Sequence, residues 1–184
     1  LILERGLFLS SKRATEARDL LISFLANFPD NPRTPEAALA LAESAIFSLP
    51  FDRELALKNI TPLKFDLKTK PDFEARRVLV LLALNKGIQQ AQDFLTKAPS
   101  HPLAPRVLFQ LGQTYRKPTN ERDKEIGKAN YQFELLIEKY PASEFTDPAR
   151  YYSALTSTAL KTDSADKTAI LRFRELIDKK GVLA

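Results

Sequence analysis

The chain has 184 residues, 44% of them hydrophobic and 28% charged, a composition that excludes intrinsic disorder and allows one domain or one short repeat array. Its 28 Lys and Arg against 23 Asp and Glu give a net charge of +5 that is spread along the chain, whereas nucleic-acid binders usually cluster their basic residues. The absence of Cys excludes disulfides and Cys-ligated metals, and no apolar run approaches the roughly 20 residues that span a bilayer.

Hydrophobic periodicity predicts about ten helices and no strand, so we expect an all-α fold. The expected helices are 1–11, 14–27, 35–48, 52–68, 72–84, 87–97, 103–116, 121–139, 147–160 and 165–179. Pro62 lies inside the fourth of these and predicts a kink or break there. The polar stretch "RKPTNERDKE" (116–125) predicts a longer turn between the seventh and eighth helices.

Consecutive helices are expected to pair as five antiparallel hairpins in a single domain, 1–184. The hairpins run over about 1–29, 35–68, 72–99, 103–141 and 147–180. Both ends, "LILERGLFL" and "GVLA", are apolar, and the chain begins with Leu and contains no Met. We therefore expect a piece of a longer polypeptide, with exposed apolar surface at one or both ends that further repeats or self-association would cover.

Three prolines mark an internal repeat. Pro29, Pro99 and Pro141 each follow an apolar helical pattern, "FLANFP", "FLTKAP" and "LIEKYP". A small residue stands twelve positions before each of these prolines and another stands thirteen positions after it: Ala17, Gly87 and Ala129, then Ala42, Gly112 and Ala154. Small residues let two helix axes approach closely, so this register predicts helix hairpins that pack on one another. Thr34 before Pro35 and Asp147 before Pro148 are expected to cap the helices that follow.

The small, aromatic and proline positions resemble those of the tetratricopeptide repeat. The stretch "ANYQFELLIEKYPASEFTDPARYYSA" (129–154) is similar to repeats of the bacterial outer-membrane assembly lipoproteins and of the periplasmic coordinator of the Tol–Pal system. The match is good near 17–45, 87–114 and 129–156 and partial at 52–83, and the Trp that is frequent in the first helix is missing. The resemblance implies a right-handed superhelical array, an α-solenoid, that binds protein segments, and it implies the bacterial periplasm or the periplasmic face of the outer membrane; a cytoplasmic location stays open.

No residue pattern points to catalysis or to a cofactor. The single His101 lies in the Pro-flanked turn "APSHPLAP" without a nearby nucleophile, and we expect it to be a turn residue. The five Gly residues form no phosphate-binding loop, and no acidic cluster has calcium-loop spacing. We therefore expect neither an enzyme nor a metal or cofactor site.

The candidate partner-binding residues lie on the first helices of successive hairpins, which line the concave face of tetratricopeptide arrays. They are Arg77, Arg106, Phe109, Gln113, Arg116 and Tyr151. Arg77 and Arg106 each stand six positions before a small residue and are expected to share one inner wall. We expect these arginines to be exposed, so that charge reversal would weaken partner binding without lowering stability. Ordinary solvated arginines and core aromatics are the alternative interpretation.

The sequence thus predicts a protein–protein interaction scaffold, whose partner it does not identify. A domain that binds nucleic acid or another anionic polymer through a basic wall is the first alternative. An architectural segment that packs against the rest of a longer repeat protein is the second.

Overall fold

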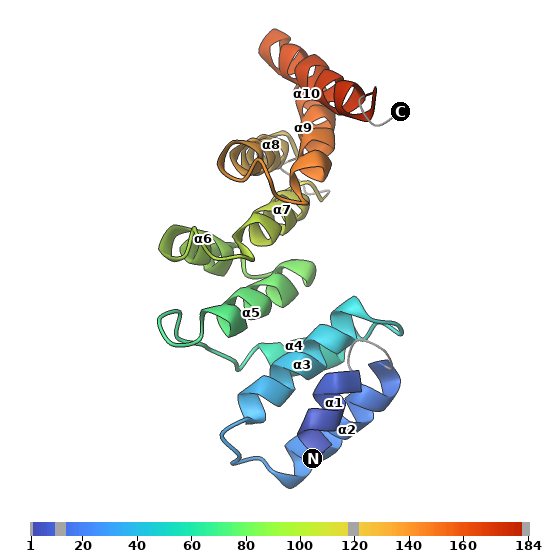
Figure 1. Ribbon diagram of the computed structural model, residues 1–184, viewed down its shortest axis with the longest axis vertical. Coiled ribbons are helices and arrows are strands. Elements are labelled where there is room, and N and C mark those ends of the chain that lie inside the picture. Colours follow the sequence, from blue (N-terminus) through green and yellow to red (C-terminus); the bar gives the residue numbers. More distant parts are fainter. Residues whose placement is uncertain (1, 10–13, 118–121, 182–184) are drawn as a thin grey trace. The chain divides into compact units, whose positions relative to one another are not determined.

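The computed structural model describes residues 2–9, 14–117 and 122–181, and every regular element in these ranges is a helix (Figure 1). The expected all-α fold class is therefore confirmed. The helices form two compact units, Leu1–Ala98 and Pro99–Ala184, and each predicted hairpin falls almost wholly within one of them. Residues 118–121 of the predicted long turn lie outside the described residues.

Unit 1 contains α1 to α6. Their bounds are α1 (Ile2–Leu9), α2 (Ala14–Asn27), α3 (Thr34–Phe47), α4 (Arg53–Ile60), α5 (Pro71–Ala83) and α6 (Ile88–Lys97). α3 contacts α1, α2, α4 and α5, and its sequence "AALALA" is buried throughout. A helix that is apolar on all sides needs neighbours on all sides, so α3 is the centre of this unit.

Unit 2 contains α7 (Ala104–Tyr115), α8 (Arg122–Lys139), α9 (Thr146–Leu160) and α10 (Asp163–Gly181). Each helix packs on the next along the chain. The small residues Gly112, Ala129 and Ala154 are all buried, as their register predicts. No helix in the described part of the chain is long and apolar enough to cross a membrane.

The fourth predicted helix is shorter than expected. α4 ends at Ile60, two residues before Pro62, so the predicted break is confirmed but residues 63–68 do not continue the helix. The Asp66 side chain instead accepts a hydrogen bond from the Lys68 backbone, and its carbonyl accepts one from Lys70. These bonds hold an ordered loop that leads into α5.

The junctions between hairpins share one hydrogen-bonded turn. After Pro29, the Asn31 side chain accepts from the Arg33 backbone, and the Thr34 backbone donates to the Asn31 carbonyl. After Pro141, Ser143 makes the same two contacts with the backbone of Phe145 and Thr146. The turn therefore repeats along the chain in the register of the prolines.

A third copy of this turn shows the structural role of His101, the only histidine of the sequence. His101 stands two residues after Pro99, its Nδ1 accepts from the Leu103 backbone, and its carbonyl accepts from Ala104. Its expected role as a turn residue is confirmed by these contacts, which fix Nδ1 as the hydrogen-bond acceptor.

The expected threonine and aspartate caps differ from the structure. Thr34 and Thr146 are the first residues of α3 and α9, and the residues before them cap the helices without a side-chain bond. The threonine hydroxyls donate backward instead, from Thr34 to the Phe28 carbonyl and from Thr146 to the Tyr140 carbonyl. Each hydroxyl therefore stabilises the turn that follows the proline instead of capping the helix.

Candidate functional site

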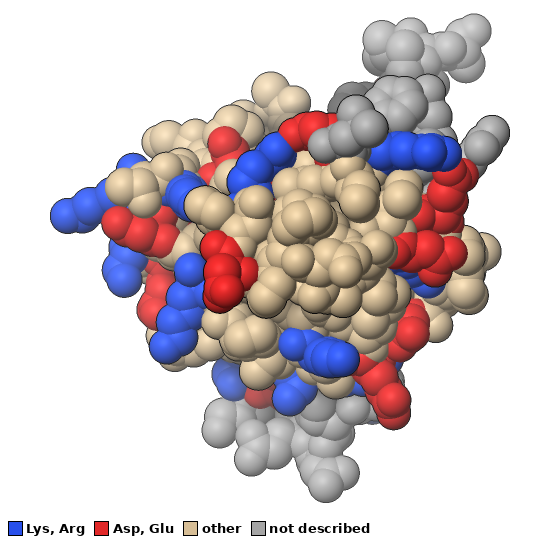
Figure 2. Space-filling view, turned by 90° about the horizontal axis from the view of Figure 1, so that it is seen from below, with Lys and Arg blue, Asp and Glu red and all other residues tan. Residues whose placement is uncertain are grey.

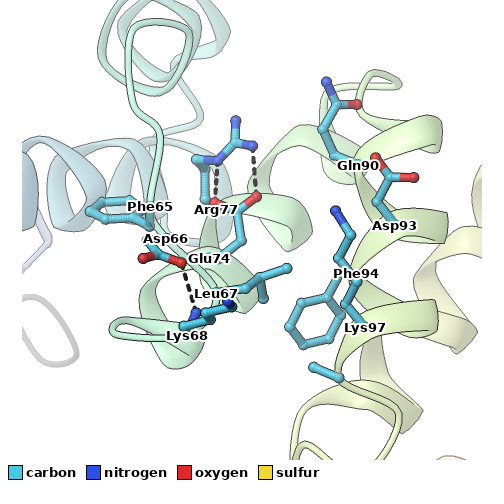
Figure 3. A pocket seen from close by; sticks show the side chains of 11 residues that line it. Phe65, Asp66, Leu67, Lys68, Glu74, Arg77, Gln90, Asp93, Phe94 and Lys97 are labelled. Carbon is cyan, nitrogen blue, oxygen red and sulfur yellow. Dashed lines mark hydrogen bonds and ion pairs between the residues drawn. The ribbon is translucent and has the colours of Figure 1, made fainter.

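Arg77 lies at a groove in unit 1 with a volume of about 710 Å³ (Figure 3). The groove is bounded by α5, α6 and the loop after α4. Its lining residues are Phe65, Asp66, Leu67, Lys68, Glu74, Arg77, Gln90, Asp93, Phe94, Lys97 and Ala98. Figure 3 shows the side chains from α6 opposite the Arg77–Glu74 pair on α5.

The guanidinium of Arg77 is already bound within its own helix. Its Nε and Nη2 each donate to the Glu74 carboxylate at 2.7 Å, and Arg77 is only 9% exposed. This is a bidentate ion pair that is largely shielded from water. The expectation that Arg77 is an exposed cation therefore differs from the structure, because a carboxylate one turn earlier neutralises and covers it.

The rest of the groove carries charges of both signs. Asp93 accepts from Gln89 at 2.9 Å, while Lys68 and Lys97 add two cations to the wall. Phe94 is 1% exposed and supplies an apolar floor. Such a lining suits a polar polypeptide segment better than a small apolar ligand.

Four of the remaining candidate residues lie on α7 and α9 in unit 2, and Arg116 directly follows α7. Phe109, Gln113, Arg116 and Tyr151 gather around Tyr152. Arg116 lies over the Tyr152 ring, 4.7 Å from its centroid, and its Nε donates to Gln113 at 3.1 Å. The Phe109 ring is 5.8 Å from Tyr152, and the Tyr151 ring is 5.3 Å from it. We call Phe109, Gln113, Arg116, Tyr151 and Tyr152 the Arg116 surface.

The Arg116 surface combines an exposed cation with rings that are partly buried. Phe109 also packs on Phe133 and Phe145, with ring centroids 5.9 and 5.6 Å apart, so the lower part of the cluster belongs to the core. Tyr151 remains 46% exposed. The alternative interpretation, that these aromatics are core residues, thus fits Phe109 better than Tyr151.

Arg106 is exposed on α7, three residues before Phe109 and seven before Gln113. This spacing places Arg106, Phe109 and Gln113 along one side of the helix. The structure therefore brings five of the six candidate residues together in unit 2, whereas Arg77 lies in unit 1. That Arg77 and Arg106 share one wall stays a prediction.

Sequence reasoning missed the acidic partners of the arginines. Glu43 accepts two hydrogen bonds from Arg76, at 2.8 and 2.5 Å, and this bonding raises the pKa of the Arg76 guanidinium. Glu74 could have been found from its spacing, because a carboxylate three residues before an arginine shares its helix face. Glu43 could not, because it is 33 residues away from Arg76.

No family model matches the chain, and a search of the curated proteins finds no match either. Within the described residues, no three acidic or histidine side chains gather in a way that could hold a metal ion.

Proposed function

We propose that the chain is a protein-interaction scaffold of the tetratricopeptide type, a superhelical solenoid that binds a segment of a partner protein. The observation that carries the proposal is the recurrent turn after Pro29, Pro99 and Pro141, in which the side chain two residues later accepts a backbone N–H each time. A structural unit that recurs along a chain is characteristic of repeat proteins, in which each repeat packs on its neighbours.

The Arg116 surface, together with Arg106, supplies a suitable binding site. The Tyr152 ring supports one face of the Arg116 guanidinium, and the exposed guanidinium retains N–H groups that can bind a carboxylate. Tyr151 offers an exposed ring beside it, and aromatic and arginine side chains dominate the binding energy of many interfaces. We therefore propose that the partner segment carries an acidic residue next to an apolar one.

Nucleic-acid or anionic-polymer binding is less well supported. Figure 2 shows basic and acidic side chains interspersed around the face in view, without a broad area of one sign. The arginines of α5 and α9 are engaged with carboxylates, as in the pairs Arg76–Glu43 and Arg150–Asp147. A periplasmic location in envelope assembly, which the resemblance implies, is part of the proposal and rests on the resemblance alone.

The test begins with an affinity pull-down from the native host and ends with calorimetry on the captured partner. We expect the double variant Arg106→Glu/Arg116→Glu to weaken binding by about 1–3 kcal/mol while the fold is kept. The matched control is Lys139→Glu/Lys167→Glu, which changes the net charge equally at two exposed positions of unit 2. Equal losses in both variants, or a steep log-linear dependence of affinity on salt, would favour non-specific anion binding over the proposed site.

A further inference from the structure

A second, apolar groove lies in unit 1 between α2 and α4 and shares no residue with the proposed site. Two cavities of about 400 and 290 Å³ lie along it and share the lining residues Leu25, Lys58 and Asn59, so they are parts of one groove. The groove is otherwise lined by Ile22, Ala26, Pro29, Thr34, Pro35, Ala38, Leu41, Leu55, Pro62 and Leu63.

The groove opens directly onto the core of unit 1. Leu41 and Ala38 of α3 form its floor and are 1% and 8% exposed. Leu25 and Leu55, from α2 and α4, each pack against two core clusters of the unit. On the wall formed by α2, Ile22 keeps 44% of its surface exposed, so apolar area remains for a ligand to cover.

The chemistry of the walls indicates a helical ligand. α2 and α4 satisfy their backbone groups internally, and the Asn59 amide donates to the Leu55 carbonyl of its own helix. An extended segment would therefore bury N–H and C=O groups without partners, which is costly, whereas a helix satisfies its own. From Ile22 to Ala26 the α2 wall spans about 6 Å, roughly one helical turn, and the groove continues past the end of α2 to Pro29.

The charge of the groove indicates which charge the ligand should carry. Lys58 is exposed at the rim and is the only charged residue in the lining of both cavities. We propose that the α2–α4 groove binds an amphipathic helix whose apolar side chains recur at i, i+4 and i+7 and which carries an acidic residue beside that stripe, facing Lys58. This surface is independent of the Arg116 surface, so either proposal can fail without the other.

The test uses a library of 16-residue helical peptides displayed on phage, with Leu, Ile, Phe or Ala in the apolar stripe and Glu, Gln or Lys in the neighbouring position. Selection on the 184-residue chain is expected to enrich Glu over Lys. The chain contains no Trp, so a Trp added to the best peptide reports binding by fluorescence. A version of that peptide with two prolines in its centre, which cannot be helical, should lose binding at least about tenfold.

Variants of the chain locate the site. Lys58→Glu should weaken binding of the Glu peptide about fivefold and should make the chain prefer the Lys peptide. The control Lys64→Glu, at an exposed position outside the groove, should keep the preference for the Glu peptide. Ala26→Glu places a charge in the groove and should abolish binding, whereas Arg116→Glu should leave it unchanged; circular dichroism checks that each variant folds. The proposal is overturned if no helical peptide binds, if the proline peptide binds equally well, or if neither groove variant alters binding.

Discussion

Gly112 of α7 lies directly against the ring of Phe133 of α8. A Cβ atom placed on Gly112 would be 2.6 Å from Cε1 and 2.8 Å from Cζ of that ring, closer than van der Waals contact allows. The ring is fully buried and stacks on Tyr152 at 5.7 Å, so it has little room to move away. At this position, therefore, even one methyl group is too large.

Gly112→Ala is expected to destabilise unit 2 by about 1–3 kcal/mol, because α7 and α8 must separate or the Phe133 ring must shift. Urea unfolding followed by circular dichroism measures the change. Gly127→Ala on α8 is the matched control, since nothing lies within 4 Å of the added Cβ. There the better helix propensity of Ala should stabilise the protein by about 0.5–1 kcal/mol. Equal effects of the two substitutions would contradict the close contact.

Arg18→Gln should destabilise unit 1 by roughly 2–3 kcal/mol. The Arg18 guanidinium is buried and donates to the carbonyls of Ser44, Ser48 and Pro50, which lie at and just beyond the end of α3. A shorter, uncharged amide cannot reach all of these acceptors, so the variant loses several hydrogen bonds made by a buried charged group. Thermal unfolding measures the loss. Arg5→Gln, which removes an exposed ion pair with Glu16, serves as the control and should change stability by less than about 1 kcal/mol.

Glu134 should make the stability of unit 2 sensitive to acid. Burial alone would raise the pKa of its carboxyl group, but hydrogen bonds from Arg172 and Ser153 and the charge of Arg172 outweigh burial and lower it. A lowered folded-state pKa means that the contribution of Glu134 is complete above the unfolded value, near 4.5, and is lost as the pH falls through the lower folded value.

The free energy of unfolding should therefore fall more steeply below about pH 4.5 in the wild type than in Glu134→Gln. Chemical unfolding at a series of pH values between about 2 and 6 gives the comparison. Glu138→Gln, on the same helix but exposed, should retain the steep fall. A wild-type profile that matches that of Glu134→Gln would show that the Arg172 contact does not persist in solution.

Arg77→Met should lower stability by about 3–5 kcal/mol, because it leaves the Glu74 carboxylate in a shielded site without its partner. The double variant Glu74→Leu/Arg77→Met should recover most of that loss, since it removes both charges. Melting temperatures of the two variants test the pair. If the single variant melts like the wild type, Arg77 is an exposed cation after all, as the sequence suggested.

Sequence periodicity was sufficient for most of the helices and for the register of the small residues, because both depend on local features, but it extended α4 by eight residues too far. Pro62 and the residues around Gly112 predicted the end of α4 and the close packing of α7 on α8. The register explains Gly87 only in part. Gly87 precedes α6 with a φ of 74° and lies close to Leu81, so this position needs a glycine for its left-handed backbone as well as for close packing.

The candidate site was harder to predict because side-chain partners come from distant parts of the chain. Arg18 and Ser44 are 26 residues apart, and Arg172 and Glu134 are 38 apart. Whether an arginine is a free surface cation or a structural one depends on such partners. The sequence therefore placed Arg106, Phe109, Gln113 and Tyr151 on helices that the structure contains, with Arg116 one residue past the end of α7, but did not show that Arg77 is enclosed.

The contact between α8 and α9 contains a polar centre. The Asn130 side-chain oxygen of α8 accepts a hydrogen bond from the Thr156 hydroxyl at 2.9 Å and lies 3.1 Å from the Ser153 hydroxyl oxygen, which donates to Glu134. If α9 slid along α8 by one turn, about 5.4 Å, Leu160 would take the place of Thr156 in one direction and Ala149 that of Ser153 in the other, so part of the polar contact with the amide would be lost. Apolar ridges alone would tolerate such a slip at little cost. The polar contact of Asn130 thus favours the observed alignment of α8 and α9, which a purely apolar interface would specify less strictly.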